Sequence, residues 1–133
     1  MAAKKQTLSN LLLDAVLSNV AYVSPAAVYV ALYTVAPTAT TAGTEVATAG
    51  GTLYNRIVGV FNPAAAGSAD NSGAVLFTVA GAAWGIVAAA AICESAVPGT
   101  NDHLYFGNLS VSKDVGVGDQ LNFAIGAIVV SES

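Results

Sequence analysis

The stretch Val28-Tyr29-Val30-Ala31-Leu32-Tyr33-Thr34 decides the fold class that this sequence predicts. Its even-numbered positions up to Leu32 carry apolar side chains, and so do its odd-numbered positions up to Tyr33. Successive side chains of a β-strand point to opposite faces, so residues two apart share a face. Because both sets are apolar, we expect a strand that is covered on both of its faces.

Further stretches have the composition of strands, since they are rich in β-branched and aromatic residues and lie between Gly, Pro, Asn and Asp. They span residues 52–61, 75–79, 86–94, 103–108, 111–117, 120–125 and 127–130. In the first of them, alternation places the even-numbered side chains from Tyr54 to Val60, including Arg56, on one face. Seven or eight short strands predict a mainly β fold, a jelly-roll-like β-sandwich of two sheets with a helix before it.

The helix is expected because apolar residues recur every three or four positions near the N-terminus. They are Leu8, Leu11, Leu12, Ala15 and Val16, with Leu13, Leu17 and Val20 beside them. Thr7 or Ser9 can cap the helix, which we expect to end near Asn19. A helix so rich in Leu must pack on something, so it either covers its own sheet or docks on a partner.

Charged side chains are scarce in this sequence. They make up 9% of its residues, against about 25% in typical soluble domains, while 55% of the residues are hydrophobic. The apolar content excludes disorder, and four Lys and Arg residues are too few to line a nucleic-acid interface. A surface so poor in charge indicates association, and we favour a subunit of an assembly over a solitary compact β domain.

The length of the chain fits one domain over residues 1–133, with an arm and helix over 1–25 and the sandwich over 26–133. We expect no membrane partner, because the longest uncharged apolar stretch, Val79–Cys93, is shorter than the roughly 20 residues of a spanning helix. The N-terminus resembles a secretory signal, but Asp14 interrupts its apolar part. This favours a helix and synthesis in the cytoplasm.

Catalytic residues are not predicted. His103 is the only histidine in the sequence, and its position after Asp102 is typical of a partly exposed turn residue rather than a catalytic base. Cys93 is the only cysteine, which excludes an internal disulfide and a cysteine-rich zinc site, and we expect a buried, inert thiol. We therefore expect no enzyme and no cofactor.

A metal site is not predicted either. The stretch Asp70-Asn71-Ser72-Gly73 lacks the spaced carboxylates of a calcium loop, so we interpret it as a turn. We expect Arg56 to pair with a carboxylate such as Glu94 in a partly buried setting, or else to face a partner.

The order of these features resembles a group of small tailed-bacteriophage virion proteins, labelled tail-fibre proteins and sometimes capsid-associated proteins. The motifs that carry the resemblance are the Leu-rich helix, Val28–Thr34, Pro37-Thr38, Gly43-Thr44-Glu45-Val46, Tyr54-Asn55-Arg56, Ala83-Trp84-Gly85, Leu104–Leu109, Ser112-Lys113 and Val117-Gly118-Asp119. The resemblance covers roughly residues 8 to 130 and implies a virion structural protein made in the cytoplasm of a host bacterium. The group often has an Asp where this chain has Cys93-Glu94-Ser95.

Our leading hypothesis is a capsid cement, or decoration protein, which binds the exterior of the major capsid shell, bridges its subunits and self-associates as a dimer or trimer. The expected contacts belong to the N-terminal arm and helix and to the loop from Thr38 to Thr48. They are Lys4, Lys5, Leu8, Leu12, Val16, Thr38, Thr41 and Glu45. The alternatives are a tail-associated fibre or adaptor, and a carbohydrate-binding sandwich that presents Tyr29, Tyr33 or Tyr54 to a cell-surface glycan.

Overall fold

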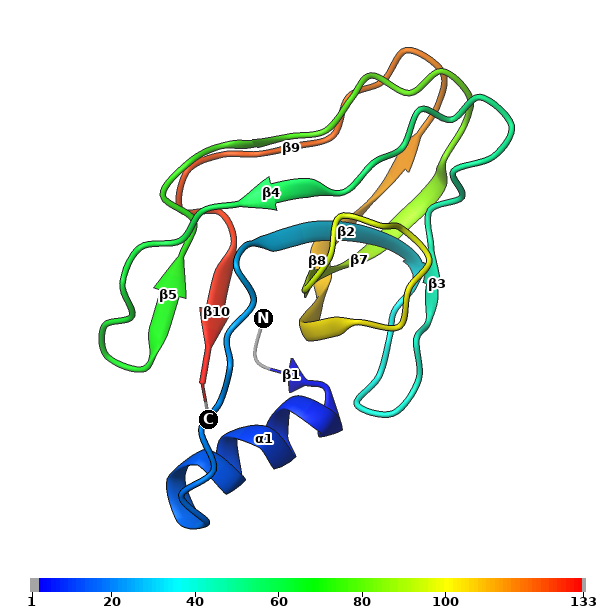
Figure 1. Ribbon diagram of the computed structural model, residues 1–133. Helices are drawn as coiled ribbons and strands as arrows, with labels where there is room; N and C mark the ends of the chain where they lie inside the picture. Colours follow the sequence, from blue (N-terminus) through cyan, green and yellow to red (C-terminus); the bar gives the residue numbers. More distant parts are fainter. Residues whose placement is uncertain (1–2, 133) are drawn as a thin grey trace.

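The computed structural model describes residues 3–132 and has one helix and several short strands (Figure 1). In chain order the elements are β1 (Ala3–Lys4), α1 (Gln6–Leu17), β2 (Val28–Val35), β3 (Thr44–Glu45), β4 (Ile57–Gly59), β5 (Ser68–Asp70), β6 (Val75–Leu76), β7 (Gly85–Cys93), β8 (His103–Val115), β9 (Asn122–Phe123) and β10 (Val129–Ser131). The mainly β class with an N-terminal helix is confirmed. Several predicted strands are shorter than expected, because their ends run into irregular loops.

The largest sheet is antiparallel and has the strand order β1-β8-β7-β2-β3. β2 lies inside this sheet and pairs with β7 along one of its own edges. Along its other edge, β2 pairs with β4 near its first residues and with β3 near its last residues. Two further sheets have two strands each, β10 with β5 and β6 with β9. Figure 1 shows α1 below the large sheet, away from β4 and β9. The strands thus form one large sheet and two small ones, and the expected jelly-roll sandwich is not confirmed.

Both faces of β2 are covered, as the alternation predicts. Val30 and Leu32 are fully buried in the main core, which also contains Tyr54, Phe77 and Trp84. The side chains on the opposite face, from Ala31 and Tyr33, pack with the Ala-rich strand β7 in a second cluster that includes Cys93. Burial of each large apolar side chain contributes about 1.5–3 kcal/mol, so the two-sided strand is a main source of stability.

The second predicted strand, over residues 52–61, is wrong in length and in its alternation. Only Ile57–Gly59 forms a strand. The buried positions are even-numbered up to Arg56, but the next buried position is the odd-numbered Gly59. Tyr54 and Arg56 are buried as a pair, whereas Val58 and Val60 are more than half exposed. The side chains of Tyr54 and Arg56 are held by hydrogen bonds to polar partners. This part of the chain therefore does not form the regular backbone hydrogen bonds of a strand.

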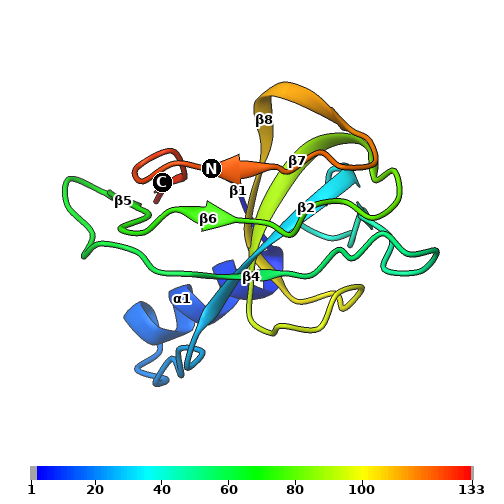
Figure 2. The same cartoon turned by 90° about the horizontal axis from the view of Figure 1, so that it is seen from above.

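β8 joins two predicted strands into one, but its pairing with β7 is interrupted. Ala89 lies opposite Asn108, whereas Val87 lies opposite Lys113. Residues 109–112 therefore bulge from the sheet, and Figure 2 shows β8 arching away from β7. Such a bulge increases the local twist of a strand.

The helix begins earlier than expected. Lys5 takes the N-cap position and makes no side-chain capping bond, while Ser18 ends the helix. Ser9, one of the two expected caps, instead lies within the helix, where its hydroxyl donates to the carbonyl of Lys5. The chain just before α1 is anchored through β1, which pairs with β8, and through an ion pair between Lys4 and Glu132. The two ends of the described chain thus lie side by side (Figure 1).

Candidate binding surfaces

An exposed turn over residues 38–41 lies at the start of the loop that we expect to bind a partner. The hydroxyl of Thr38 accepts from the backbone nitrogens of Thr40 at 3.3 Å and Thr41 at 3.0 Å. The hydroxyl groups of Thr38 and Thr41 are 2.7 Å apart, and the backbone nitrogen of Thr38 donates to the carbonyl of Thr41 at 3.0 Å. These bonds fix the turn while leaving its side chains exposed, which reduces the entropy lost on binding.

His103 fastens this turn to the large sheet. Its Nε2 donates to the carbonyl of Thr38 at 2.8 Å, and the ring packs edge-on against Phe106. Only 1% of His103 is exposed, so the expectation of a partly exposed turn histidine is wrong, because the first residue of β8 points inward. Burial lowers the pKa of His103 and the charge of Lys5 adds to this, against the opposing effects of the Thr38 carbonyl and Asp102. The neutral ring therefore has a structural role, since it connects the turn to the large sheet.

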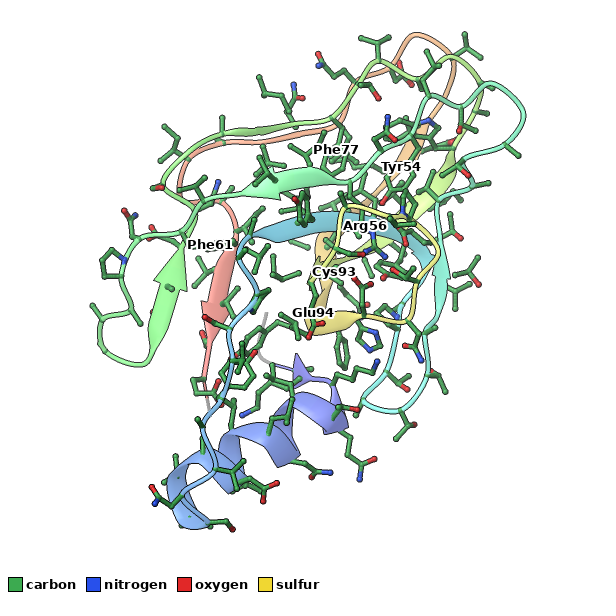
Figure 3. The ribbon with its side chains drawn as sticks, in the orientation of Figure 1. Tyr54, Arg56, Phe61, Phe77, Cys93 and Glu94 are labelled. Carbon is green, nitrogen blue, oxygen red and sulfur yellow. The ribbon has the colours of Figure 1, made fainter. Side chains whose placement is uncertain are left out.

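Arg56 holds the other end of the same loop. Its Nε and Nη2 donate to the two carboxylate oxygens of Glu45, at 3.0 and 2.8 Å, and its Nη1 donates to Asp102 at 2.9 Å. The expected partner, Glu94, is exposed and takes no part, so that prediction is corrected to Glu45 and Asp102. Figure 3 shows Arg56 beside the loop that follows β7. The guanidinium is buried between two carboxylates, which raises its pKa although burial alone would lower it.

The carboxylates at this cluster have further hydrogen bonds. Glu45 accepts from the hydroxyl of Tyr54 at 2.6 Å and from the backbone nitrogen of Gly99 at 2.9 Å. Burial would raise the pKa of Asp102, but hydrogen bonds from Thr100, Arg56 and Ser95 lower it overall. A buried ion pair stabilises a fold only when its remaining donors and acceptors are satisfied, as they are here. The cluster therefore joins β3 to the loop over residues 94–102.

Cys93 is buried, as predicted, and lies 3.8 Å from the hydroxyl of Tyr33. Burial raises the pKa of its thiol to about 12, despite the nearby charge of Arg56. The thiolate is the reactive form of cysteine, so this side chain is inert at neutral pH.

Two of the three tyrosines considered for sugar binding are inside the protein. Tyr33 and Tyr54 are each 2% exposed, and Tyr54 packs edge-on against Trp84 in the core. Tyr29 is half-buried. The proposed glycan surface of exposed aromatic rings is therefore wrong for Tyr33 and Tyr54.

The outer face of α1 and the residues just after it carry an exposed apolar surface. We call this surface the outer stripe, and it consists of Leu13, Val16, Leu17 and Val20. Leu13 and Leu17 are four positions apart and Leu13 and Val16 three, as neighbours on a helix surface are, and Val20 follows the end of the helix. The inner face packs on the protein through Leu8, which is 3% exposed, with Leu12 partly buried. Val16 is 79% exposed, the largest value in the stripe.

An apolar cleft lies between the large sheet and the small sheet of β5 and β10. Its volume is about 490 Å³. Figure 3 shows Phe61, one of its lining residues, near β5 and β10. The main apolar lining comes from Val28, Phe61, Ile92, Leu104, Tyr105 and Val130. Among its lining residues only Glu132 is charged, and that carboxylate binds Lys4 and the hydroxyl of Tyr105.

Apart from Leu12, which is partly buried, the expected contact residues fall into three groups. Val16, Thr38 and Thr41 are exposed, although on two separate surfaces. Leu8 and Glu45 lie inside the fold, Leu8 in apolar packing and Glu45 in an ion pair with Arg56. The side chains of Lys4 and Lys5 bind Glu132 and the carbonyl of Asn101.

Sequence reasoning missed the role of Asn71, which it placed in an ordinary turn. Asn71 is fully buried, and its amide bonds to the carbonyls of Gly73 and Ala124 and to the backbone nitrogen of Ile128. It therefore joins the segment after β5 to the segment before β10. Because its side chain makes these bonds within the protein, this polar residue can be fully buried.

Neither a metal site nor a membrane helix is found in residues 3–132. The described residues hold no cluster of three or more His, Cys, Asp or Glu side chains that could bind a metal ion. None of the helices in this part of the chain is long and apolar enough to span a bilayer.

Comparison with known proteins gives the family of this chain. The sequence model described as "Podophage GP4 fiber I protein gp80" matches residues 3–131. The chain belongs to this family. The resemblance to small tailed-phage virion proteins is thereby confirmed, and the chain is a phage virion structural protein. A search of curated proteins finds no significant match.

Proposed function

We propose that this chain is a non-enzymatic structural subunit of the phage tail-fibre apparatus, which acts through contacts with other virion proteins. The family match over residues 3–131 carries this proposal, because the family is described as a fibre protein. The buried state of His103 and Cys93 agrees with it, since neither residue offers an exposed catalytic group.

The contact surface that we assign to the virion partner is the exposed turn over residues 38–41, with the loop that continues to Thr48. Thr38 and Thr41 present short polar side chains on a backbone that is fixed by His103 and by their own hydrogen bonds. A surface that is already ordered binds at a lower entropic cost than a flexible loop.

Capsid cement remains the second candidate. The observation that favours it is the shape of the fold, because residues 3–132 form short strands around a common core rather than an elongated shaft. In this role the same turn would bind the exterior of the major capsid protein and bridge its neighbouring subunits. Repetition over the shell would then make many weak contacts effective together.

Copy number and location in purified particles test both functions. Quantitative mass spectrometry against the major capsid protein, with gold labelling of intact particles, is expected to find a few copies at the tail. Hundreds of copies over the head would support cement instead. Absence of the chain from particles would overturn both functions.

A variant pair tests the assigned surface. Thr41→Arg places a long charged side chain on the turn and is expected to reduce incorporation into particles at least about tenfold, because interface centres are depleted in charge. Ser110→Arg makes the same change on the exposed bulge of β8 and is expected to be incorporated normally. Equal incorporation of the two variants would exclude the turn as the contact surface.

A further inference from the structure

We propose that the outer stripe of α1 docks into the apolar cleft of a second copy of this chain, and that two copies do so reciprocally. This inference rests on the proposed function, in which the chain is a subunit of an assembly, and names one of its partners. It is carried by two complementary features of the same molecule, an apolar ridge and an apolar hollow.

The ridge is formed by exposed apolar side chains at the end of α1 and just after it. Leu8 faces inward, yet Val16 and Leu17 on the outer side are 79% and 76% exposed. Large apolar side chains that are exposed together in this way are typical of an interaction site. Asp14 is the only charged residue of α1 and follows Leu13 by about 100° around the helix, outside the stripe. The outer stripe therefore presents no charge to a partner.

The hollow has the size and chemistry to receive such a ridge. Its volume of about 490 Å³ compares with roughly 150 Å³ for an apolar cavity that holds one benzene molecule. The cleft can thus take several Leu or Val side chains. The one charged lining residue, Glu132, forms an ion pair with Lys4 and accepts a hydrogen bond from Tyr105. An apolar side chain that enters the cleft therefore meets no unpaired charge.

The outer stripe cannot fill the cleft of its own chain in this arrangement. The start of α1 is fixed by two backbone bonds, from Lys5 to the carbonyl of Leu104 at 2.9 Å and from Gln6 to the carbonyl of Ala39 at 2.8 Å. Leu8 near the start of α1 is held inside, whereas Val16 and Leu17 at its end are 79% and 76% exposed and point away from the protein. The occupant is therefore another molecule, and a second copy carries the matching ridge.

The size of the contact favours reciprocal docking. A standard interface engages about 20–30 residues on each side. The four residues of the outer stripe are too few for a stable contact, and so are the apolar lining residues of one cleft. Reciprocal docking engages both the stripe and the cleft of each copy. A two-fold pair of this kind also closes on itself and leaves neither feature open to further growth.

The test is the oligomeric state of the purified chain, measured by analytical ultracentrifugation over a range of concentrations. We expect a dimer. Leu17→Asp puts a charge on the outer stripe, and Ala64→Trp fills the cleft from an exposed lining position. Each variant is expected to weaken dimerisation at least about tenfold, which is the effect of losing one central contact residue. Val97→Asp makes the same kind of change at another exposed apolar residue, 60% exposed, outside both features and is expected to dimerise normally.

Mixing the two variants distinguishes this contact from simple pairing of helices. The mixture retains one intact contact, between the outer stripe of the Ala64→Trp chain and the cleft of the Leu17→Asp chain, so it is expected to associate more tightly than either variant alone and more weakly than the wild type. Circular dichroism checks that both variants fold. If Ala64→Trp alone dimerises normally, the cleft is not the docking site. A monomeric wild-type chain that is nevertheless found in particles would overturn this inference and leave the proposed function standing.

Discussion

His103 and Thr38 are 65 residues apart in sequence, yet the imidazole Nε2 donates to the Thr38 carbonyl at 2.8 Å. The other ring nitrogen, Nδ1, is buried and has no hydrogen-bond partner among residues 3–132. This one bond connects the first residue of the longest strand to the turn that we assign to a virion partner. The conformation of the turn therefore depends on a residue that is buried inside the fold.

Replacing His103 with Phe should loosen the turn without emptying the core. Phe keeps the ring packed against Phe106 but leaves the Thr38 carbonyl without its donor. We expect the free energy of unfolding to fall by about 1–3 kcal/mol and the amides of Thr40 and Thr41 to exchange faster. Urea unfolding and hydrogen exchange measure these effects. Thr48→Ala, an exposed change in the same loop, should stay within about 0.5 kcal/mol of the wild type. Unchanged exchange at the turn would contradict the coupling.

The pH dependence of stability should also report on His103. Burial is the main cause that lowers its pKa below the ordinary value of 6.5; Lys5 and Arg56 add to the effect, while the Thr38 carbonyl and Asp102 oppose it. Below pH 6.5 the unfolded chain therefore binds a proton that the folded chain does not, so stability falls as the pH drops, by at most about 1.4 kcal/mol per pH unit.

Urea midpoints between pH 7.5 and pH 5 measure this fall. The lowered pKa values of Asp102 and Glu132 start from 3.8 and 4.5, so the stability that those groups add is lost only at lower pH. His103→Phe should be flatter than the wild type over the upper range. A wild-type curve that is equally flat would show that His103 keeps its ordinary pKa in the folded state.

Loss of Arg56 should be the most destabilising single change in the polar cluster. Arg56→Met leaves Glu45 and Asp102 buried without their counter-charge, which typically costs about 3–5 kcal/mol. Arg56→Lys keeps the charge but cannot bind both carboxylates with a planar fork, so its loss should be intermediate. Chemical denaturation measures both variants. Lys113→Met, an exposed change of the same kind, is the control and should be nearly neutral.

Cys93 should react with thiol reagents only when the protein opens. Its pKa of about 12 and its complete burial both suppress the thiolate at neutral pH. We expect labelling by a disulfide reagent to be very slow in native buffer and rapid in denaturing urea, followed by absorbance. A fast reaction of the native protein would show that β7 opens locally well below the global unfolding free energy.

Patterns of apolar residues predicted the parts of this fold that depend on burial alone. The alternation over 28–34 gave a strand covered on both faces, and the Leu-rich segment gave a helix. The isolated cysteine gave a buried thiol. In each case a short stretch of sequence was sufficient for the prediction, because apolar side chains tend to be buried even when the residues that cover them are unknown.

Contacts between distant polar residues could not be predicted in the same way. The sequence predicted a carboxylate partner for Arg56 and offered Glu94 as an example, but the partners are Glu45 and Asp102, from other segments of the chain. The burial of His103 likewise depends on Thr38, far away in sequence. Register and loop packing decide such pairs, and a single sequence carries no signal for either.

The ion pair between Lys4 and Glu132 means that the polypeptide enters and leaves the fold at one spot. A short flexible peptide could therefore join the two ends, and new ends could be opened at an exposed loop tip such as residues 47–51. Glu132 also lines the apolar cleft. A purification tag or fluorescent protein fused at either end would thus stand at the mouth of that cleft, and its placement would itself obstruct whatever enters there.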